Sequence, residues 1–281
     1  MGQVAQQNRS AVAAKSWSVR WQPARLVNGA PVLFRVSAPR RLASLEGKWL
    51  DHRVFFSLDG KTRTWYALAG VSLDTKPGVY ALKLSGSTTQ GKAVSFKRSI
   101  AVHRGKYRSI EVQVDSKYTE PSPEQLQKIN QDKALKQELF GKVGPEREWS
   151  GSFLAPVKAE TSDNFGTRRT FNGEVRSLHQ GLDYAVPEGT PVSALNRGTV
   201  MLARSLYFEG NCVVLDHGQG LLTLYLHLSQ IDVKEGDVVK GGQKIGLSGG
   251  TGRATGPHLH IAVRWEGVYV DPATLLSLKL P

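Results

Sequence analysis

The sequence of 281 residues has little cysteine and no long apolar run, and each absence excludes a class of protein. The single cysteine, Cys212, rules out an internal disulfide, and without a Cys-x-x-Cys pair any metal must be bound by histidines and carboxylates. No apolar stretch approaches the ~20 residues of a transmembrane helix. Residues 1–15 lack the apolar core of a signal peptide, so no export signal is visible, and we expect them to form a flexible polar tail.

The positive charge is distributed unevenly along the chain. Residues 1–150 contain 25 Lys and Arg against 12 Asp and Glu, whereas residues 151–281 contain 12 of each, so the whole net charge of +13 belongs to the first half. A basic half favours an anionic partner such as an envelope polymer, a membrane surface or nucleic acid, although a solubilising surface explains it equally well. No RNA-binding or helix-turn-helix signature is present, so we expect no nucleic-acid partner.

Residues 16–115 predict a small β-sandwich. Seven short segments rich in Val, Phe, Trp and Tyr are separated by turn signals such as "LDGK" and "TKPG", and "SIEVQV" (109–114) is counted as the last of them. Seven strands in about a hundred residues fit an immunoglobulin-like sandwich. Because the region has no cysteine pair, this similarity concerns the architecture only.

Residues 116–148 predict a helical linker. Ser122 fits the N-cap, Pro123 the first helical residue and Gln125 the third position of a capping box, while Gly141 fits the stop. Beyond this linker, residues 149–281 are again rich in glycine and strand-like segments, with no long helical pattern. The sequence therefore predicts a mainly β protein with a second β domain, and Cys212, in the apolar run "GNCVVLDHG", is expected to be a buried structural thiol rather than a nucleophile.

Five of the seven histidines lie in the neutral C-terminal half, and two of them form the pattern "HLH". On a strand, His258 and His260 point to the same side roughly 6–7 Å apart, while Leu259 and Ile261 point to the other. Two imidazoles on one face suit a metal, or a metal and a catalytic base. A solvated strand face is an equally good explanation of this pattern alone.

A second segment, "HQGLD", has His179 and Asp183 four residues apart. On a straight strand they would be roughly 13 Å apart, too far to bind one ion. The chain must therefore bend if both are ligands, and Gly181 permits a bend. The alternative is a turn that contains an aspartate by chance.

The segment "LLTLYLHLS" alternates apolar and polar side chains. Its four leucines predict a core-facing side, which would direct Thr223, Tyr225 and His227 to the opposite face as one wall of a site. His217, at a glycine-rich turn, is expected to be structural, and His52 and His103 are expected to lie on the surface of the sandwich. A catalytic zinc needs three protein ligands and an open position, so this histidine and aspartate inventory favours metal-assisted hydrolysis.

These segments occur in an order that resembles the lysostaphin-type, or LytM-like, zinc endopeptidases of bacterial cell walls, over about residues 151–275. The matching motifs are "FGTRR" (165–169), "HQGLDYAVPEGTPVSALNRGTV" (179–200), "GNCVVLDHGQGLLTLYLHLSQIDVKEGDVVKGGQKIG" (210–246), "GGTGRATGPHLHIAV" (249–263) and "VDP" (270–272). The resemblance implies a small antiparallel β-sheet with a groove between long loops, and one zinc ion bound by His179, Asp183 and His260. It also implies that His227 and His258 flank the reacting water as general base or as stabilisers of the tetrahedral oxyanion.

The activity that the resemblance implies is hydrolysis of a peptide bond in the stem peptide or cross-bridge of peptidoglycan, in the cell envelope. Asn164 and Arg168 are expected to contact substrate in the groove, and Tyr225 is expected to contact substrate or to support the site. The alternative is an envelope adaptor or activator that binds peptidoglycan without cutting it, since some relatives have lost metal ligands. A third hypothesis is that the sandwich or the helix folds over the groove and limits access to it.

Overall fold

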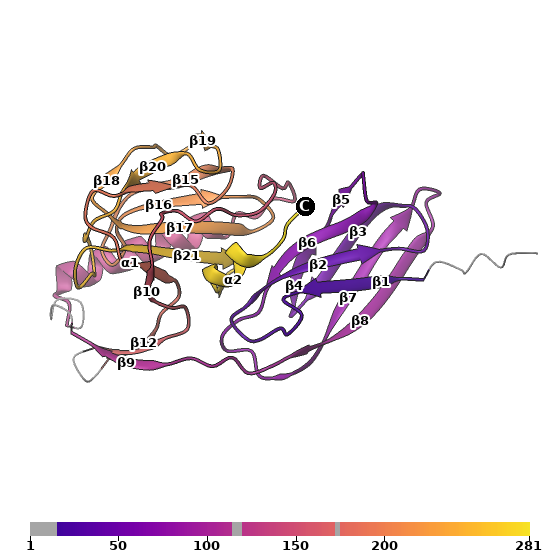
Figure 1. Cartoon of the computed structure of the whole chain (residues 1–281), viewed down its shortest axis with the longest axis horizontal. Helices are drawn as coiled ribbons and strands as arrows, with labels where there is room; N and C mark the ends of the chain where they lie inside the picture. Colours follow the sequence, from indigo (N-terminus) through magenta and orange to yellow (C-terminus); the bar gives the residue numbers. More distant parts are fainter. Residues whose placement is uncertain (1–15, 114–119, 172–174) are drawn as a thin grey trace, which may run out of the picture.

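The computed structural model describes residues 16–113, 120–171 and 175–281, so the polar tail expected at residues 1–15 lies outside the described residues. The structure is mainly β and consists of two units side by side (Figure 1). The N-terminal unit contains two antiparallel four-stranded sheets. The first has the order β1 (Ser18–Gln22), β2 (Pro31–Ser37), β6 (Thr64–Gly70) and β5 (Ser57–Asp59). The second has the order β4 (His52–Phe55), β3 (Leu42–Trp49), β7 (Gly78–Thr88) and β8 (Ala93–Val102).

The two N-terminal sheets share one apolar core. Phe34 of β2 packs edge-on against Trp49 of β3, with ring centroids 5.5 Å apart, and both side chains are fully buried. The segments predicted from the sequence do not include β3, because its buried Leu42, Leu45 and Trp49 are separated by serine, glutamate, glycine and lysine. Its buried residues complete the inner face of the second sheet, so the sandwich is closed by a strand with a weak apolar pattern.

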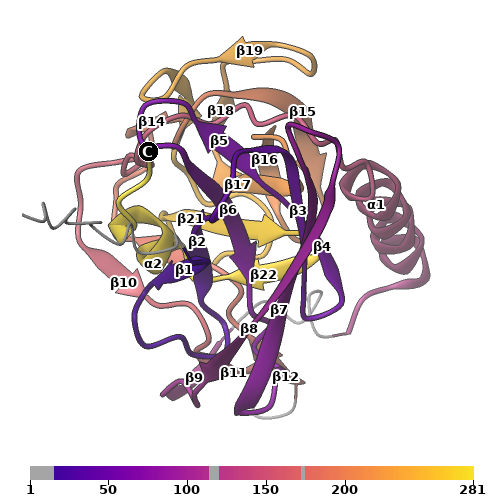
Figure 2. The same ribbon diagram turned by 90° about the vertical axis from the view of Figure 1, so that its right-hand side faces the viewer.

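One predicted sandwich strand belongs elsewhere. β9 (Ser109–Val112) makes no pair in either sandwich sheet and instead runs parallel to β11 (Arg168–Phe171), which pairs in turn with β12 (Val175–Leu178). Figure 2 shows these three strands together at one edge of the molecule. The alternating pattern of the segment predicted a strand correctly, but the partner of a strand is set by tertiary structure and not by its own pattern.

The C-terminal unit is built on an eight-stranded sheet. Its order is β10 (Thr161–Asp163), β13 (Leu182–Tyr184), β21 (Leu259–Trp265), β17 (Leu221–Leu228), β16 (Gly210–Asp216), β15 (Gly198–Leu206) and β19 (Val238–Val239), with β22 (Val268–Val270) paired to β21. A small sheet beside it has the order β14 (Pro191–Ser193), β20 (Lys244–Leu247) and β18 (Gln230–Ile231). The central strands β16 and β17 are buried on both faces, which explains their nearly continuous apolar sequences.

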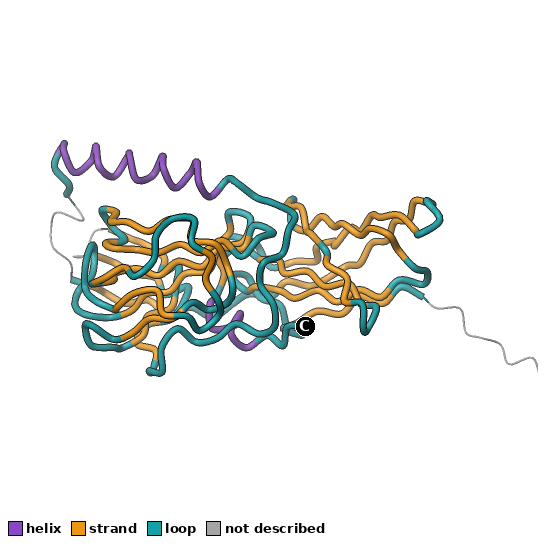
Figure 3. Tube along the Cα trace, turned by 90° about the horizontal axis from the view of Figure 1, so that it is seen from above, coloured by secondary structure: helices purple, strands orange, loops and turns teal. Residues whose placement is uncertain are grey.

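One face of the large sheet is covered by the predicted helix, α1 (Pro123–Phe140). Its start is as predicted, because the Ser122 side chain accepts from the Gln125 backbone N–H and the Gln125 side chain accepts from the Ser122 N–H. Gly141 follows its last residue. Phe140 joins a buried cluster with Leu202, Cys212 and other residues of the sheet, and Figure 3 shows the helix lying along the C-terminal unit. Cys212 is therefore a buried thiol, as predicted, and burial raises its pKa to about 12.

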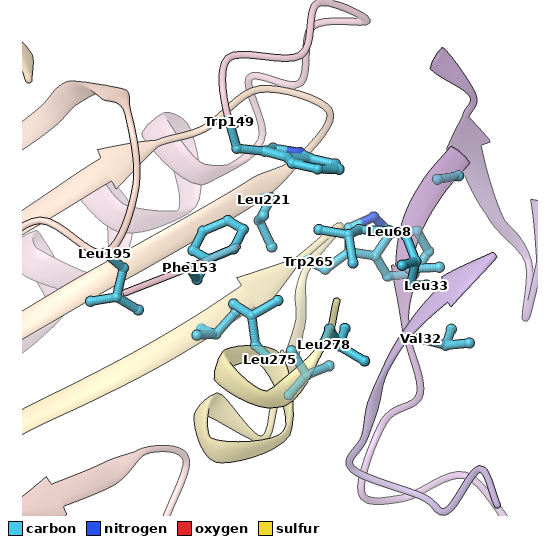
Figure 4. Close-up of a cluster of buried hydrophobic side chains, with 14 of the residues drawn as sticks. Val32, Leu33, Leu68, Trp149, Phe153, Leu195, Leu221, Trp265, Leu275 and Leu278 are labelled. Atoms are coloured by element: carbon cyan, nitrogen blue, oxygen red, sulfur yellow. The ribbon is translucent and has the colours of Figure 1, made fainter. Parts of the chain in front are cut away.

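The two units are joined by a buried apolar cluster, which Figure 4 shows around Trp265. The His52 ring of β4 lies 5.3 Å from the Trp265 ring of β21, so His52 is partly buried at this junction and not on the free surface as expected. The backbone N–H of Asp271, which caps α2 (Pro272–Ser277), donates to the Gly29 carbonyl at 2.8 Å. Within the described ranges, neither helix combines the length and the apolar character that a membrane span requires.

Candidate metal centre

Three predicted ligands converge where β13 meets β21. Asp183 and His260 are direct partners in the antiparallel pairing, and Asp183 Oδ1 lies 2.7 Å from His260 Nδ1. His179 lies just before β13 and places its Nε2 3.1 Å from Asp183 Oδ1 and 3.0 Å from His260 Nδ1. All three side chains are buried, with exposed fractions of 2%, 8% and 11% for His179, Asp183 and His260.

The bend that this convergence requires occurs at Gly181, between His179 and β13. From the sequence, the conformational freedom of glycine explained its presence at this bend. The structure gives a different reason for the glycine. A Cβ atom at Gly181 would lie 2.3 Å from His260 Nε2 and 2.4 Å from the Ile261 carbonyl oxygen. Glycine is therefore required because β21 and its histidine approach the bend closely.

The hydrogen bonds of His179 fix which nitrogen faces the other ligands. Its Nδ1 lies 2.9 Å from the Asn164 carbonyl oxygen, which can only accept, so Nδ1 carries the proton. In the neutral ring the Nε2 lone pair then points at Asp183 Oδ1. His179 Nε2 and Asp183 Oδ1 are then two acceptors 3.1 Å apart, an arrangement that a cation bound between them would stabilise. The donor set fits zinc, because imidazole and carboxylate are zinc ligands at about 2.0–2.2 Å and tetrahedral ligands are then roughly 3.3–3.5 Å apart.

The electrostatics of the three residues agree with a metal site. Burial alone would raise the pKa of Asp183, but the close contacts of its carboxylate with the His179 and His260 rings favour the ionised form and keep this pKa below its usual range. Burial also lowers the pKa of His260. The chain therefore presents an ionised carboxylate and a ring whose neutral form is favoured, which are the protonation states that a metal requires.

His227 and His258 flank this cluster with their rings 4.8 Å apart. The Nδ1 of His227 donates to the Thr251 carbonyl at 2.8 Å, and the Nδ1 of His258 donates to the Gly256 carbonyl at 2.9 Å. Each neutral ring is thus left with an Nε2 lone pair that can accept a proton. Burial lowers the pKa of His227 to about 3.

The position of His227 corrects the predicted strand alternation. Thr223 and Tyr225 are fully buried on the side of the main core, and the opposite side of β17, with Leu224 and Leu226, faces the cavity. His227 joins that opposite side because it has a φ of +61° at an irregularity where two residues of β17 lie opposite one of β16. Such a bulge redirects one side chain, so the histidine reaches the site only through a break in the pattern.

A cavity of about 520 Å³ opens above the five residues. One wall comes from the edge sheet, through Ile110 and Val112 of β9 and Leu178 of β12. Phe208 and the loop 253–257 also line the cavity. Because β9 belongs to the segment that leads out of the sandwich, the groove is completed by residues well outside the region of family resemblance.

The predicted substrate contacts have different fates. Tyr225 is fully buried, and its hydroxyl accepts from the Leu195 backbone N–H at 2.7 Å, so the prediction that it contacts substrate is wrong and it supports the core instead. Asn164 and Arg168 are exposed near the cluster, but neither is among the residues that line the cavity. His217 is structural as expected, because its nitrogens bond to the Arg197 carbonyl and the Thr223 hydroxyl.

Sequence reasoning missed three residues beside the cluster. Asp163 and Arg169 line the cavity, and Arg169 Nη2 donates to Asp183 Oδ2 at 2.7 Å. Thr251 contributes a backbone carbonyl to His227. No spacing rule could have indicated Thr251, since any residue type supplies a carbonyl. The opposite charges within "SDNFGTRR" were the one available signal for the other two.

Known proteins resemble this chain over different lengths. The model of peptidase family M23 matches residues 177–272. The crystal structure of a putative peptidase M23 from Pseudomonas aeruginosa is 30% identical, with a TM-score of 0.69, and the match covers 90% of this chain and 95% of that one. Peptidoglycan DD-endopeptidase ShyA of Vibrio cholerae is 44% identical over 125 residues, which is 44% of this chain and 28% of ShyA.

A third relative, DD-carboxypeptidase/endopeptidase Mpg of Neisseria meningitidis, is 42% identical over 142 residues, which is 50% of this chain and 32% of Mpg. The matched region thus spans about a third of the length of these two curated relatives. The Pseudomonas structure, in contrast, corresponds to this chain almost from end to end, and the segment matched by the family model contains the three predicted ligands, His179, Asp183 and His260. On these grounds the chain belongs to peptidase family M23.

Proposed function

We propose that this protein is a zinc-dependent endopeptidase that cleaves peptide bonds of peptidoglycan in the cell envelope. The observation that carries the proposal is the convergence of His179, Asp183 and His260 beside two histidines with available Nε2 atoms, at the floor of one cavity. The names of the relatives ShyA and Mpg support peptidoglycan as the substrate.

His179 Nε2, Asp183 Oδ1 and His260 Nδ1 would hold the zinc ion. When bound, zinc lowers the pKa of a water molecule to roughly 7 and polarises the scissile carbonyl. The chain's own residues move the protons. The Nε2 of His227 or His258 accepts a proton from the attacking water, and the protonated ring then donates it to the leaving amine. The second ring remains in position to hydrogen-bond the oxygen on which negative charge develops.

The groove supplies orientation. Arg169, Leu178 and Phe208 line it together with the three proposed ligands, so an extended peptide bound in the groove would contact these side chains. We also propose that the exposed side chains of Asn164 and Arg168 contact substrate that extends beyond the cavity. Both positions can be tested by alanine substitution, which should raise KM and leave the zinc content unchanged.

Digestion of purified peptidoglycan tests the reaction. Following the names of the relatives, we expect cleavage of D,D-cross-linked muropeptides and a smaller effect on pentaglycine cross-bridges, with fragments identified by mass spectrometry. A chelator should stop the release of fragments and added zinc should restore it. Asp183→Ala protein, folded by circular dichroism, serves as the control. A zinc-loaded protein that binds these fragments and never cleaves them would instead establish the adaptor alternative.

The sandwich supports a second proposed role, binding to a linear anionic polymer of the envelope. Four cations form one row across the neighbouring strands of its second sheet. Arg53 lies directly opposite Lys48, Lys48 opposite Lys83, and Lys83 opposite Lys97. All four side chains are exposed. Lys48 and Arg53 form ion pairs with Asp51 and Glu46, but Lys83 lies opposite two lysines. Like charges directly opposite each other destabilise a sheet, so a bound polyanion would offset the cost at Lys83. We further propose that this eight-stranded unit is an immunoglobulin-like sandwich.

Inorganic polyphosphate is a suitable probe for this row. The triple variant Lys48→Gln, Lys83→Gln, Lys97→Gln should lose most of the binding at low salt, whereas the matched triple variant Lys61→Gln, Lys76→Gln, Lys92→Gln, with the same change in charge, should retain it. Binding should weaken as salt rises. Equal losses in both variants would show that net charge alone attracts the polymer.

A further inference from the structure

Asp163 is a buried carboxylate that the proposed ligand set does not use. It accepts from five donor groups: Arg108 Nη2 at 2.5 Å, Arg169 Nη2 at 2.6 Å and Nε at 3.0 Å, the Thr167 hydroxyl at 2.9 Å and the Asn164 backbone N–H at 2.8 Å. Burial opposes its ionisation, but these donors lower its pKa to about 2. A carboxylate so fully occupied holds its donors in place.

Arg169 connects this carboxylate to the proposed metal ligand. Its Nη2 lies 2.6 Å from Asp163 Oδ2 and 2.7 Å from Asp183 Oδ2. The other oxygen of Asp183, Oδ1, is the one that faces His179 and His260. The two oxygens of Asp183 are therefore divided between the guanidinium and the ligand cluster, which fixes the rotation of the carboxylate.

Arg108 brings the chain that leaves the sandwich into the same network. Its carbonyl accepts from the Arg168 N–H at 2.9 Å, next to the parallel pairing of β9 with β11. The preceding residue, Tyr107, covers Gly166, where a Cβ atom would lie 2.1 Å from its ring, and Gly166 also has a φ of +81°. The Tyr107 hydroxyl donates to the Asn28 carbonyl of the sandwich. The segment is thus anchored at both ends.

We propose that Arg108, Asp163 and Arg169 form a positioning chain that holds Asp183 as a ligand through one oxygen, so that the segment leaving the sandwich sets the zinc affinity of the peptidase unit. The inference rests on the ligand set proposed above. Substitution of a residue that hydrogen-bonds to a metal ligand typically weakens metal binding by about 10- to 100-fold. Arg169 bonds to the ligand itself and should have an effect in that range. The Arg108 side chain is half exposed and acts through Asp163, so its effect should be about 3- to 10-fold.

The test measures the zinc dissociation constant of the full chain by competition with a chromophoric chelator. Arg169→Gln should weaken zinc binding by about 10- to 100-fold and Arg108→Gln by about 3- to 10-fold. Lys106→Gln removes the same charge from an exposed position two residues away and should bind zinc as the wild type does. The thermal midpoint of each metal-free protein is recorded in parallel.

A double-substitution cycle tests whether Asp163 transmits the effect. If it does, Arg108→Gln should weaken zinc binding in the wild type and have no further effect in the Asp163→Asn background. Zinc constants within twofold of wild type in both arginine variants, or lower thermal midpoints with unchanged zinc constants, would overturn the proposal. A wild-type chain that fails to bind zinc would instead overturn the ligand set and the proposed function.

Discussion

The second sheet of the sandwich and the large sheet of the peptidase unit use β-strands in opposite ways. In the second sandwich sheet one face is buried and the other is open, and the open face displays cations such as Lys83 and Lys97. In the peptidase unit the central strands are covered on both faces, by the main core on one side and by the α1 cluster on the other. Two residues of the candidate site lie where the regular strand pattern is interrupted, with His179 before a bend and His227 at a bulge.

The largest expected effect separates two buried histidines of the peptidase unit. His260→Ala should remove bound zinc and lower hydrolysis by at least about 10⁴-fold, because the water pKa is no longer shifted by the metal. His217→Ala should keep one zinc per chain but lower the free energy of unfolding by about 2–4 kcal/mol, since it leaves the buried Thr223 hydroxyl without that partner. Metal analysis and urea unfolding of both variants check the distinction. Zinc retained by His260→Ala would contradict it.

The next effect separates proton transfer from metal binding. His227→Gln and His258→Gln should each lower kcat by about 10²- to 10⁴-fold while the zinc content stays at the wild-type value, because both rings lie beside the proposed ligands and neither belongs to the proposed ligand set. Steady-state kinetics on a defined cross-linked muropeptide, with metal analysis of the same samples, makes the measurement. A variant with full kcat would remove that histidine from the proton transfer.

Much of the site could be predicted from the sequence, since short motifs determine local geometry. The strand pattern of "HLH" placed His258 and His260 on one side, and Gly181 indicated the bend that brings His179 near Asp183. Alternation failed at His227 because a bulge depends on how two strands register with each other. The same limit explains the placing of β9: its sequence indicates a strand, but the pairing with β11 depends on a segment about 60 residues away.

A moderate effect on stability at acid pH is expected from His217, a buried histidine of the peptidase unit. Burial lowers the pKa of His217 in the folded protein to about 4, whereas the unfolded value is about 6.5. Between these values the unfolded chain binds more protons, so stability falls as the pH falls from 6.5 to 4, by up to about 3 kcal/mol from this residue. Urea unfolding of metal-free protein should show this loss in the wild type and a smaller one in His217→Gln. Equal slopes would show that His217 is protonated in the folded state.

The smallest effect concerns the open face of the sandwich. Lys83 lies directly between Lys48 and Lys97, and the neighbouring position on the same face of its strand is Ser85. Lys83→Ser should therefore stabilise the protein by a few tenths of a kcal/mol at low salt, and the gain should vanish at about 1 M salt, where charges are screened within about 3 Å. The matched Lys76→Ser variant, whose residue precedes β7 and lies outside this row, should show no gain. Differential scanning calorimetry at the two salt concentrations measures both. A gain in stability that persists at high salt would assign the effect to strand propensity. A gain that disappears would mean that the lysines of the free sandwich repel each other, and a bound polyanion can relieve this repulsion.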